Sequence, residues 1–351
     1  MRFSIVAFSR PILRGRLTAL LACGIVAALC TRSSNAQDQT VPVTPAIRST
    51  AELVKLDVSV LDKHGDYIAG LTAKDFHILD NNSDRVIEYF APVDAPARLL
   101  VIVETSPAVY LIQDQHLAAA YSLLQGLGAD DEVALISYDS APHPLLSFTS
   151  QKSELVKALG NLQYMLGSGH LNLFDSISTA IDWLAPVIGK KEIVLLTTGL
   201  DSSPPARWDA LVAKLRAHDV VIYSVALGGP LRHAPAKKSK QAKKSKSVAT
   251  DSDSANSDSS PAENPVSFQK ADAALESLAS ITGGQVYFPS SPADFTRIYR
   301  EIASALRHQY VLGVAPAHDG QFHTLTVQAS DPSAQRIFVR QGYLAPPASA
   351  P

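Results

Sequence analysis

The first patterned stretch of the chain alternates apolar and polar residues. Between residues 53 and 60 every second position from 54 onward is Val or Leu, which is the period of a strand with one buried face. Shorter apolar runs follow at 67–71, 76–79 and 86–90, with turn-forming residues between them. Residues 50–95 are therefore predicted to form a β-rich leader module, a small β-meander that is too small to be stable alone.

From Arg98 the pattern changes to continuous apolar runs separated by helical spacing. Such runs are typical of strands that are covered on both faces, and they lie at 99–103, 133–136, 193–196 and 220–225, with a further strand at 285–288. Helical spacing predicts helices at about 112–127, 153–163, 173–187, 206–217, 268–281 and 292–306. This alternation predicts an α/β fold with a doubly wound, mostly parallel six-strand sheet over residues 97–308.

Two segments depart from this alternation of strands and helices. Residues 229–266 hold a block of lysines followed by acidic residues, serines, alanines and prolines, so a disordered charged insertion is predicted there. The tail, 309–345, is β-rich, with strands expected at 308–314, 324–329 and 337–344. Because its alternation matches that of the leader module, we expect the two β segments to pair with each other in one sheet.

The N-terminus has the pattern of a secretory signal peptide. Four arginines precede a 14-residue uncharged run at 17–30, and Ser34-Asn35-Ala36 follows as a small-x-small triplet. As a helix that 14-residue run would be about 21 Å long, whereas a helix that spans a bilayer needs roughly 20 residues. Residues 1–36 are thus predicted to be removed after Ala36 during export. Lipidation at Cys23 is the alternative, disfavoured because apolar residues continue after it.

Composition and charge narrow the classes of function. The chain is 46% hydrophobic with a formal net charge of -2, which suits a packed globular protein and gives no global field for nucleic acid. The lysines from Lys237 to Lys246 are a local basic patch that could contact an envelope or surface polyanion. A solvated linker is the alternative, because the patch lacks aromatic residues for base stacking and acidic residues follow it. Nucleic acid is therefore not predicted as a partner.

Motifs of catalysis are missing from the sequence. It contains no Gly-x-Ser-x-Gly, no phosphate loop and no His-Glu-x-x-His, and the first buried strand is not followed by a dinucleotide-binding glycine pattern. We therefore predict that the protein is not an enzyme and that it needs no cofactor.

Several segments resemble the von Willebrand factor A family. The stretch from Val103 to Ala108, which ends a buried strand, resembles the first strand and loop of that family. Residues 171–175 resemble its Thr-x-Leu-Tyr-Asp segment, residues 194–199 its fourth strand ending in Thr-Asp-Gly, and residues 221–227 its fifth strand. The motifs at 58–76 and those at 309–313 and 340–343 are similar to those of the von Willebrand A-related proteins abundant in acidobacteria. The resemblance covers roughly residues 50–345.

The resemblance implies a position for a divalent cation. In the family an Asp-x-Ser-x-Ser loop, a Thr and a second Asp hold the ion, usually Mg²⁺, and a partner protein adds a carboxylate. In this sequence these positions correspond to Glu104, Ser106, Ala108, Leu171 and Thr198. The family has two carboxylates at these positions, and this sequence has one. We therefore predict a degenerate metal site and no bound metal. Weak binding of a cation, helped by Asp201 or Asp175, is the disfavoured alternative.

Two functions follow from this interpretation. In the first, the exported chain is a non-catalytic protein-interaction module, and Glu104, Ser106, Ala108, Leu171 and Thr198 lie on the rim that binds an unknown protein partner. The rim would be ordinary polar surface at the strand ends, with Ser106 capping the following helix. In the second, the chain is an envelope scaffold that contacts the cell surface through its charged insertion.

Overall fold

The computed structural model describes residues 53–93, 96–110, 123–164, 170–187, 189–232 and 265–348. The predicted signal peptide, cleavage after Ala36 and lipidation at Cys23 lie outside the described residues, as do the lysines from Lys237 to Lys246 and most of the helix expected at 112–127. No helix among the described residues is long and apolar enough to cross a membrane.

A six-stranded sheet forms the centre of the α/β part of the chain, as predicted. Its strands run in the order β10-β9-β8-β5-β6-β7, and they comprise β5 (Ala97–Glu104), β6 (Glu132–Tyr138), β7 (Pro142–Thr149), β8 (Lys190–Thr197), β9 (Val220–Ala226) and β10 (Val286–Tyr287). All neighbouring pairs are parallel except β6 and β7, which are antiparallel. The residues of β7 gave no strand signal, because Pro142 and Pro144 interrupt the pattern; prolines are tolerated there since β7 is an edge strand.

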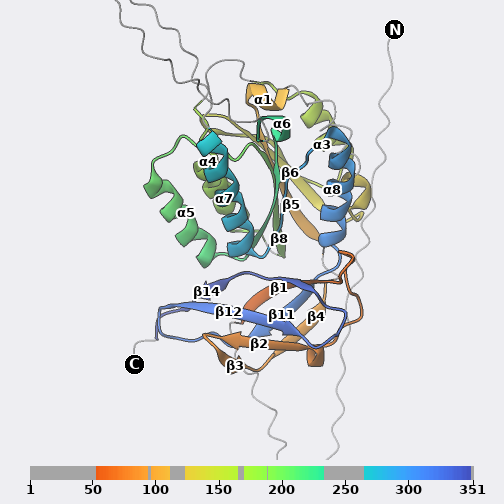
Figure 1. Cartoon of the computed structure of the whole chain (residues 1–351), viewed down its shortest axis with the longest axis vertical. Helices are drawn as coiled ribbons and strands as arrows, with labels where there is room; N and C mark the ends of the chain where they lie inside the picture. The colour runs from red at the N-terminus through yellow and green to blue at the C-terminus, as the bar shows by residue number, and fades with distance from the viewer. Residues whose placement is uncertain are drawn as a thin grey trace, which may run out of the picture. The chain divides into compact units, whose positions relative to one another are not determined.

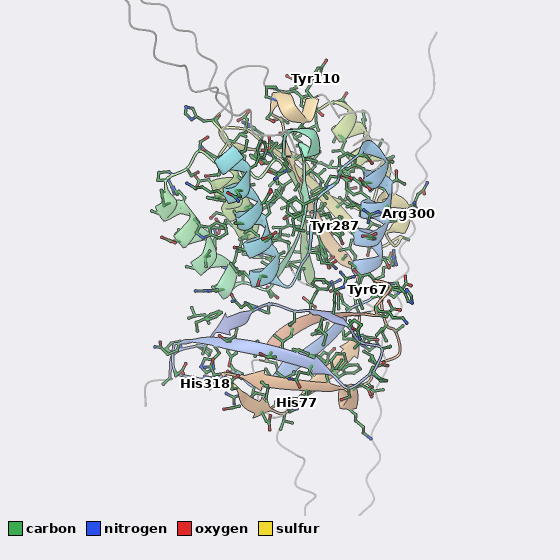
Figure 2. All side chains as sticks on the ribbon, viewed as in Figure 1. Tyr67, His77, Tyr110, Tyr287, Arg300 and His318 are labelled. Carbon is green, nitrogen blue, oxygen red and sulfur yellow. The ribbon has the colours of Figure 1, made fainter. Side chains whose placement is uncertain are left out.

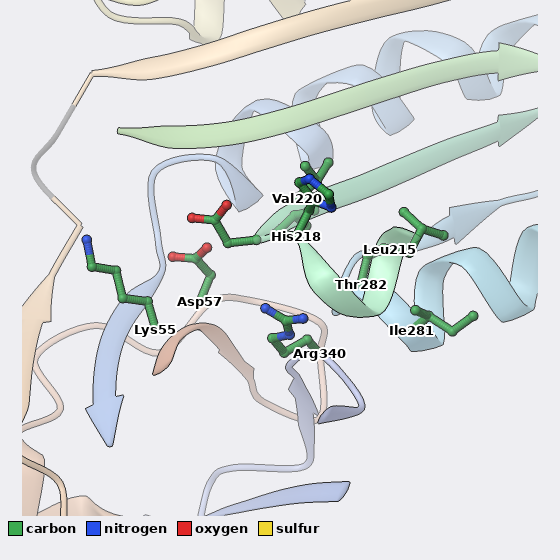
Figure 3. Close-up of a pocket in the computed structure, with 10 residues that line it drawn as sticks. Lys55, Asp57, Leu215, His218, Val220, Ile281, Thr282 and Arg340 are labelled. Atoms are coloured by element: carbon green, nitrogen blue, oxygen red, sulfur yellow. The ribbon is translucent and has the colours of Figure 1, made fainter. Parts of the chain in front are cut away.

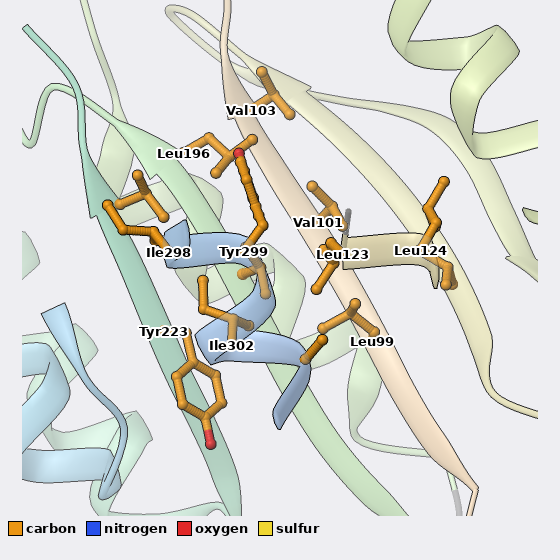
Figure 4. Close-up of a cluster of buried hydrophobic side chains, with 14 of the residues drawn as sticks. Leu99, Val101, Val103, Leu123, Leu124, Leu196, Tyr223, Ile298, Tyr299 and Ile302 are labelled. Atoms are coloured by element: carbon orange, nitrogen blue, oxygen red, sulfur yellow. The ribbon is translucent and has the colours of Figure 1, made fainter. Parts of the chain in front are cut away.

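Helices cover both faces of this sheet (Figure 1). One face carries α4 (Leu173–Leu184), α5 (Pro205–Ala217) and α7 (Pro265–Thr282), and the other carries α3 (Lys152–Gly160) and α8 (Pro292–Ala305). Figure 4 shows how Leu99 and Val101 of β5 pack near Ile302 of α8. Two short helices, α1 (Pro107–Tyr110) and α6 (Gly229–Arg232), lie at the carboxyl ends of the strands.

The prediction of a disordered insertion over residues 229–266 was wrong at its two edges, which are helical, and residues 233–264 lie outside the described residues. Residues 229–232 form α6, and α7 already begins at Pro265. Arg232 explains the first difference, since its side chain is buried against neighbouring elements and thereby holds α6 in place.

The leader and the tail pair with each other, as expected, and together they form a β module of two four-stranded sheets. One sheet has the order β13-β1-β11-β4 and the other β14-β12-β2-β3. The leader supplies β1 (Val54–Leu61), β2 (Phe76–Asp80), β3 (Ser83–Arg85) and β4 (Tyr89–Pro92), with a short 3-10 turn at Ala73–Asp75, and the tail supplies β11 (Tyr310–Val314), β12 (Phe322–Ala329), β13 (Arg336–Phe338) and β14 (Gly342–Leu344).

Two details of the β prediction were wrong. The leader is not a meander, since β1 and β4 flank β11 in one sheet whereas β2 and β3 lie in the other. The single strand expected at 337–344 is two strands, of which β13 pairs with β1 and β14 with β12. The physical reason is that strands such as β2 and β12 bury one face each, so two layers of strands are needed to enclose one core, built around residues such as Leu56, Ile78 and Leu312.

The β module contacts the α/β part at the amino ends of the parallel strands. Gln309 Nε2 donates a hydrogen bond to Tyr223 Oη at 2.8 Å, and Arg340 Nη2 donates one to the carbonyl of Arg216 at 3.0 Å. Figure 3 shows Arg340 and Asp57 of the module beside His218 and Val220 of the α/β part. In Figure 2, Tyr110 lies at the opposite end of the α/β part from the module. The carboxyl ends of the strands are therefore left uncovered by the module.

Candidate functional site

The carboxyl ends of β5, β6 and β8 bring together the best candidate site. In open α/β sheets, ligands bind in the crevice outside these ends. Glu104 ends β5, Tyr138 ends β6, and Thr197 ends β8 directly before Thr198. We call these four residues, with Arg232 of α6, the rim network.

Glu104 is the centre of the rim network. Its carboxyl group is fully buried, so its lost hydration has to be replaced by protein donors. Oε2 accepts hydrogen bonds from Thr198 N at 2.6 Å, from Thr197 Oγ1 at 3.0 Å and from Tyr138 Oη at 3.0 Å. Thr198 Oγ1 also donates to this carboxylate, at 2.9 Å from Oε2 and 3.1 Å from Oε1. Both carboxylate oxygens are thus engaged by the protein itself.

Tyr138 is held in its protonated form. Burial, together with the nearby charge of Glu104, raises the pKa of the Tyr138 phenol well above its usual value. Its Oη also lies 2.5 Å from Thr197 Oγ1. Tyr138 therefore acts at this site as a hydrogen-bond donor and not as a base.

The backbone after β8 is shaped to place Thr198 over Glu104. Gly199 follows with a φ of 77°, and a Cβ at this position would lie only 3.0 Å from Leu275 Cδ1. A residue other than glycine would be strained there. The glycine that matched the family's Thr-Asp-Gly pattern thus has a clear structural reason.

Arg232 adds a buried positive charge to the network. Its side chain is 4% exposed and forms an ion pair with Asp272 of α7. Its Nη2 donates to the carbonyl of Thr198, and its Nε donates to the carbonyl of Leu227 at 3.1 Å. Burial lowers the pKa of Arg232 to about 10, while the charge of Glu104 acts in the opposite direction. The guanidinium therefore stays charged at neutral pH.

The predicted rim residues do not form ordinary polar surface. Glu104, Ser106, Leu171 and Thr198 are all buried, and the side chain of Ala108 lies outside what the structure describes. Ser106 does not cap the next helix through its side chain: its carbonyl accepts from Val109 N at 3.1 Å, whereas its Oγ has no hydrogen-bond partner among the described residues. Glu104 is enclosed by Thr198, which donates to its carboxylate and whose own carbonyl accepts from Arg232 of α6.

The two acidic residues named as helpers are engaged elsewhere. Asp201 Oδ2 accepts a hydrogen bond from Phe174 N at 3.0 Å, and Oδ1 accepts one from Ser203 N at 2.7 Å. Asp175 lies 3.6 Å from Arg207 in an exposed ion pair. Asp201 thus ties the loop after β8 to the start of α4, and neither residue contributes a free carboxylate to the rim network.

The residues at these positions do not fit the metal ion that the family implies. Mg²⁺ needs near-octahedral coordination by hard oxygen atoms. Here the carboxylate of Glu104 already accepts protein hydrogen bonds on both oxygens, Leu171 has no side-chain oxygen, and the buried hydroxyl of Ser106 is a single neutral donor atom. Among the described residues, no group of three or more His, Cys, Asp and Glu side chains is arranged to hold a metal.

The surface around the rim network has residues that sequence reasoning missed. Tyr110 of α1 is 45% exposed and lies edge-on to Tyr164, with ring centroids 5.4 Å apart. Phe288, directly after β10, is 41% exposed, and the Arg232 guanidinium lies 5.8 Å from its ring centroid. The missed members of the network are Tyr138, Thr197 and Arg232, and its ion-pair partner Asp272 was missed as well. The sequence signal that could have found the first two is that they closely follow predicted strands.

Comparison with known proteins agrees with this architecture. A model of the von Willebrand factor type A domain matches residues 101–264. No curated protein gives a match. Beyond the matched residues, β10 and α8 belong to the same sheet and the same core.

Three solved structures illustrate the similarity. A von Willebrand factor type A protein from Catenulispora acidiphila is 13% identical over 78% of this chain and 73% of its own, with a TM-score of 0.42. An aerotolerance-related membrane protein from Bacteroides fragilis is 14% identical over 59% and 98%, with a TM-score of 0.40. The corresponding domain of the pili tip protein Mfa5 from Porphyromonas gingivalis is 12% identical over 61% and 96%, with a TM-score of 0.41. The family match places a von Willebrand factor type A domain at residues 101–264 of the chain.

Proposed function

We propose that the chain is an exported, non-catalytic protein-interaction module that recognises its partner at the carboxyl ends of the strands without a divalent metal. Domains of this family are mostly interaction modules, and the match covers the segments that carry the rim network. The observation that carries the metal-free part is the state of Glu104, whose carboxylate is buried and accepts hydrogen bonds from Tyr138, Thr197 and Thr198. Because both of its oxygens already accept hydrogen bonds from the protein, this carboxylate is a poor ligand for a metal ion.

The partner would meet the residues that surround the rim network, since the network itself is buried. Tyr110 and Phe288 are large and exposed, and exposed aromatic side chains are frequent anchors of protein interfaces. The export part of the proposal is supported by the arginines, the uncharged run and the small-x-small triplet that precede residue 37.

Binding experiments with matched surface variants test the recognition site. The full exported chain is used as bait in an envelope fraction, beside Tyr110→Ser and Phe288→Ser. Val86→Ser and Leu344→Ser are the controls, because they remove similarly exposed apolar side chains from the β module. We expect the first two variants to lose the specific partner and the controls to keep it. Retention by both rim variants would refute recognition at the carboxyl ends.

Calorimetry tests the metal-free part separately. Titration of the purified chain with Mg²⁺, Mn²⁺ and Ca²⁺ should give no sub-millimolar binding, because the oxygens of the rim network are used internally. A micromolar isotherm that is lost in Ser106→Ala would show that a metal site is present after all.

A scaffold role is the second candidate. The observation that favours it is the size of the β module, whose two four-stranded sheets enclose a core of their own. In this case the controls Val86→Ser and Leu344→Ser, or removal of the lysines from Lys237 to Lys246, would reduce retention in the envelope fraction while Tyr110→Ser would not. The two candidates therefore predict opposite sets of sensitive variants.

A further inference from the structure

The rim network contains a positive charge that the family resemblance did not anticipate. Glu104 lies at the position where the family places an acidic metal ligand, and a fully buried carboxylate is costly unless a cation or several donors compensate it. Arg232 lies on the other side of Thr198: Thr198 N and Oγ1 donate to Glu104, and the carbonyl of Thr198 accepts from the guanidinium. One residue thus bridges a buried anion and a buried cation.

We propose that Arg232 is a built-in counter-ion of the rim, taking over from a divalent cation the task of neutralising Glu104 and fastening α6 and α7 to the ends of β5 and β8. The inference rests on the proposed metal-free recognition and deepens it. Recognition by such a rim needs no carboxylate from the partner, because there is no open coordination position for the partner to fill.

The position of Arg232 is fixed by the chain around it. It ends α6, which begins at Gly229. A Cβ at Gly229 would lie 2.5 Å from the carbonyl oxygen of Pro289, so the chain approaches the segment after β10 too closely for any other residue. The guanidinium also lies 5.0 Å from the ring centroid of Phe268, which is buried. These contacts orient a planar group that can donate in several directions at once.

Asp272 does not account for the buried charge of Arg232 by itself. The side chain of Asp272 remains 32% exposed, so water can solvate it, whereas Glu104 is fully enclosed. The charge of Glu104 also raises the pKa of Arg232 against the effect of burial. The guanidinium therefore serves two carboxylates, and the enclosed one depends on it more.

A double-mutant cycle on the full chain tests the proposal. Arg232→Met keeps the length and apolar stem of the side chain but removes its charge, and Glu104→Gln removes the charge of its proposed partner. We expect Arg232→Met to lower the melting temperature by roughly 5 °C in the wild-type background and by less than about 2 °C in the Glu104→Gln background. Equal shifts in both backgrounds would mean that Arg232 contributes packing only, and would overturn the proposal.

The control is a neighbouring arginine whose ion pair is exposed. Arg207 of α5 lies 3.6 Å from Asp175 and is 59% exposed, so Arg207→Met should shift the melting temperature by less than about 1 °C in either background. If Glu104→Gln does not fold, Arg232→Lys replaces it. Lys keeps the charge, and it should retain more stability than Met; if Met is the better tolerated, the proposal fails.

Failure of this inference is distinguishable from failure of the proposed function. Each variant is also melted in EDTA and in millimolar Mg²⁺. Additive shifts without any metal effect would refute the role of Arg232 and leave metal-free recognition intact. A rise in the wild-type melting temperature with Mg²⁺ that EDTA reverses would refute both, because a ligand that binds the folded state stabilises it.

Discussion

The two ends of the central sheet each bury a glutamate, and they treat its charge differently. At the carboxyl end, Glu104 accepts hydrogen bonds from three residues, and the carbonyl of one of them, Thr198, accepts from the Arg232 guanidinium. At the amino end, Lys190 is the cation beside Glu192 of β8, and its Nζ lies 2.6 Å from Oε1. Gln309 Nε2 lies 3.5 Å from the same oxygen, and Oε2 has no hydrogen-bond partner among the described residues.

Both glutamates are fully buried, and they differ in the number of hydrogen-bond donors that compensate the charge of the carboxylate. Burial raises the pKa of Glu192 to about 7, although the charge of Lys190 acts against the shift. Glu192 is therefore a group that titrates near neutral pH at the contact with the β module. Glu104, by contrast, is part of a network that is nearly complete in hydrogen bonds.

The largest expected effect comes from removing the better-satisfied carboxylate. Glu104→Leu would leave the donors of Tyr138, Thr197 and Thr198 without their acceptor and Arg232 without its buried counter-charge. We expect a loss of about 4 kcal/mol of unfolding free energy, measured by urea denaturation. A loss below about 1 kcal/mol would contradict the assigned role of the network.

A somewhat smaller effect is expected at the other end. Lys190→Met removes the cation beside Glu192 and the hydrogen bond from Lys190 Nζ to the carbonyl of Leu306, which is 2.8 Å long. We expect a loss of about 3 kcal/mol at pH 8 and a smaller loss at pH 5, because at the lower pH Glu192 can become neutral by taking up a proton. Equal losses at both pH values would show that Glu192 does not respond to its partner.

The raised pKa of Glu192 predicts a specific pH dependence. Its pKa is about 7 in the folded state and near 4.5 in the unfolded chain, so the folded state binds more protons between these values. The contribution of this group to stability is fully present below about pH 4.5 and is lost as the pH rises toward 7. Glu192→Gln should therefore be about 2 kcal/mol more stable than the wild type at pH 8, with little difference at pH 4.5. A pH-independent difference between the two proteins would contradict the assignment.

The smallest effect is expected for a single donor of the rim network. Thr197→Val keeps the shape of the side chain but removes the hydroxyl that donates to Glu104 and accepts from Gly199 N. Because the carboxylate keeps its other donors, the loss should be about 1 kcal/mol. Thr179→Val is the matched control, since that exposed hydroxyl donates to the carbonyl of Asp175 within α4. Urea denaturation should show a larger loss of unfolding free energy for Thr197→Val than for Thr179→Val, because the Thr197 side chain is buried and the Thr179 side chain is exposed.

The sequence was sufficient to predict the α/β architecture and the loss of side-chain oxygens that could bind a metal at the rim. Continuous apolar runs can be buried only when both faces of a strand are covered, so residues 99–103 and 193–196 predicted parallel strands between helices, and both lie in the central sheet. Residue identity alone showed that Leu171 offers no oxygen to a metal.

The tertiary structure decided which distant segments meet. Alternation predicted one buried face for β1, but it could not show that β11 lies beside β1, because a hydrophobic pattern identifies the buried face of a strand and not its neighbour. Arg232 and Thr198 lie 34 positions apart, and Asp272 follows 40 positions after Arg232. Only the crossing of the chain over the sheet brings these three residues to one rim, which is why a buried counter-ion could not be predicted from the sequence.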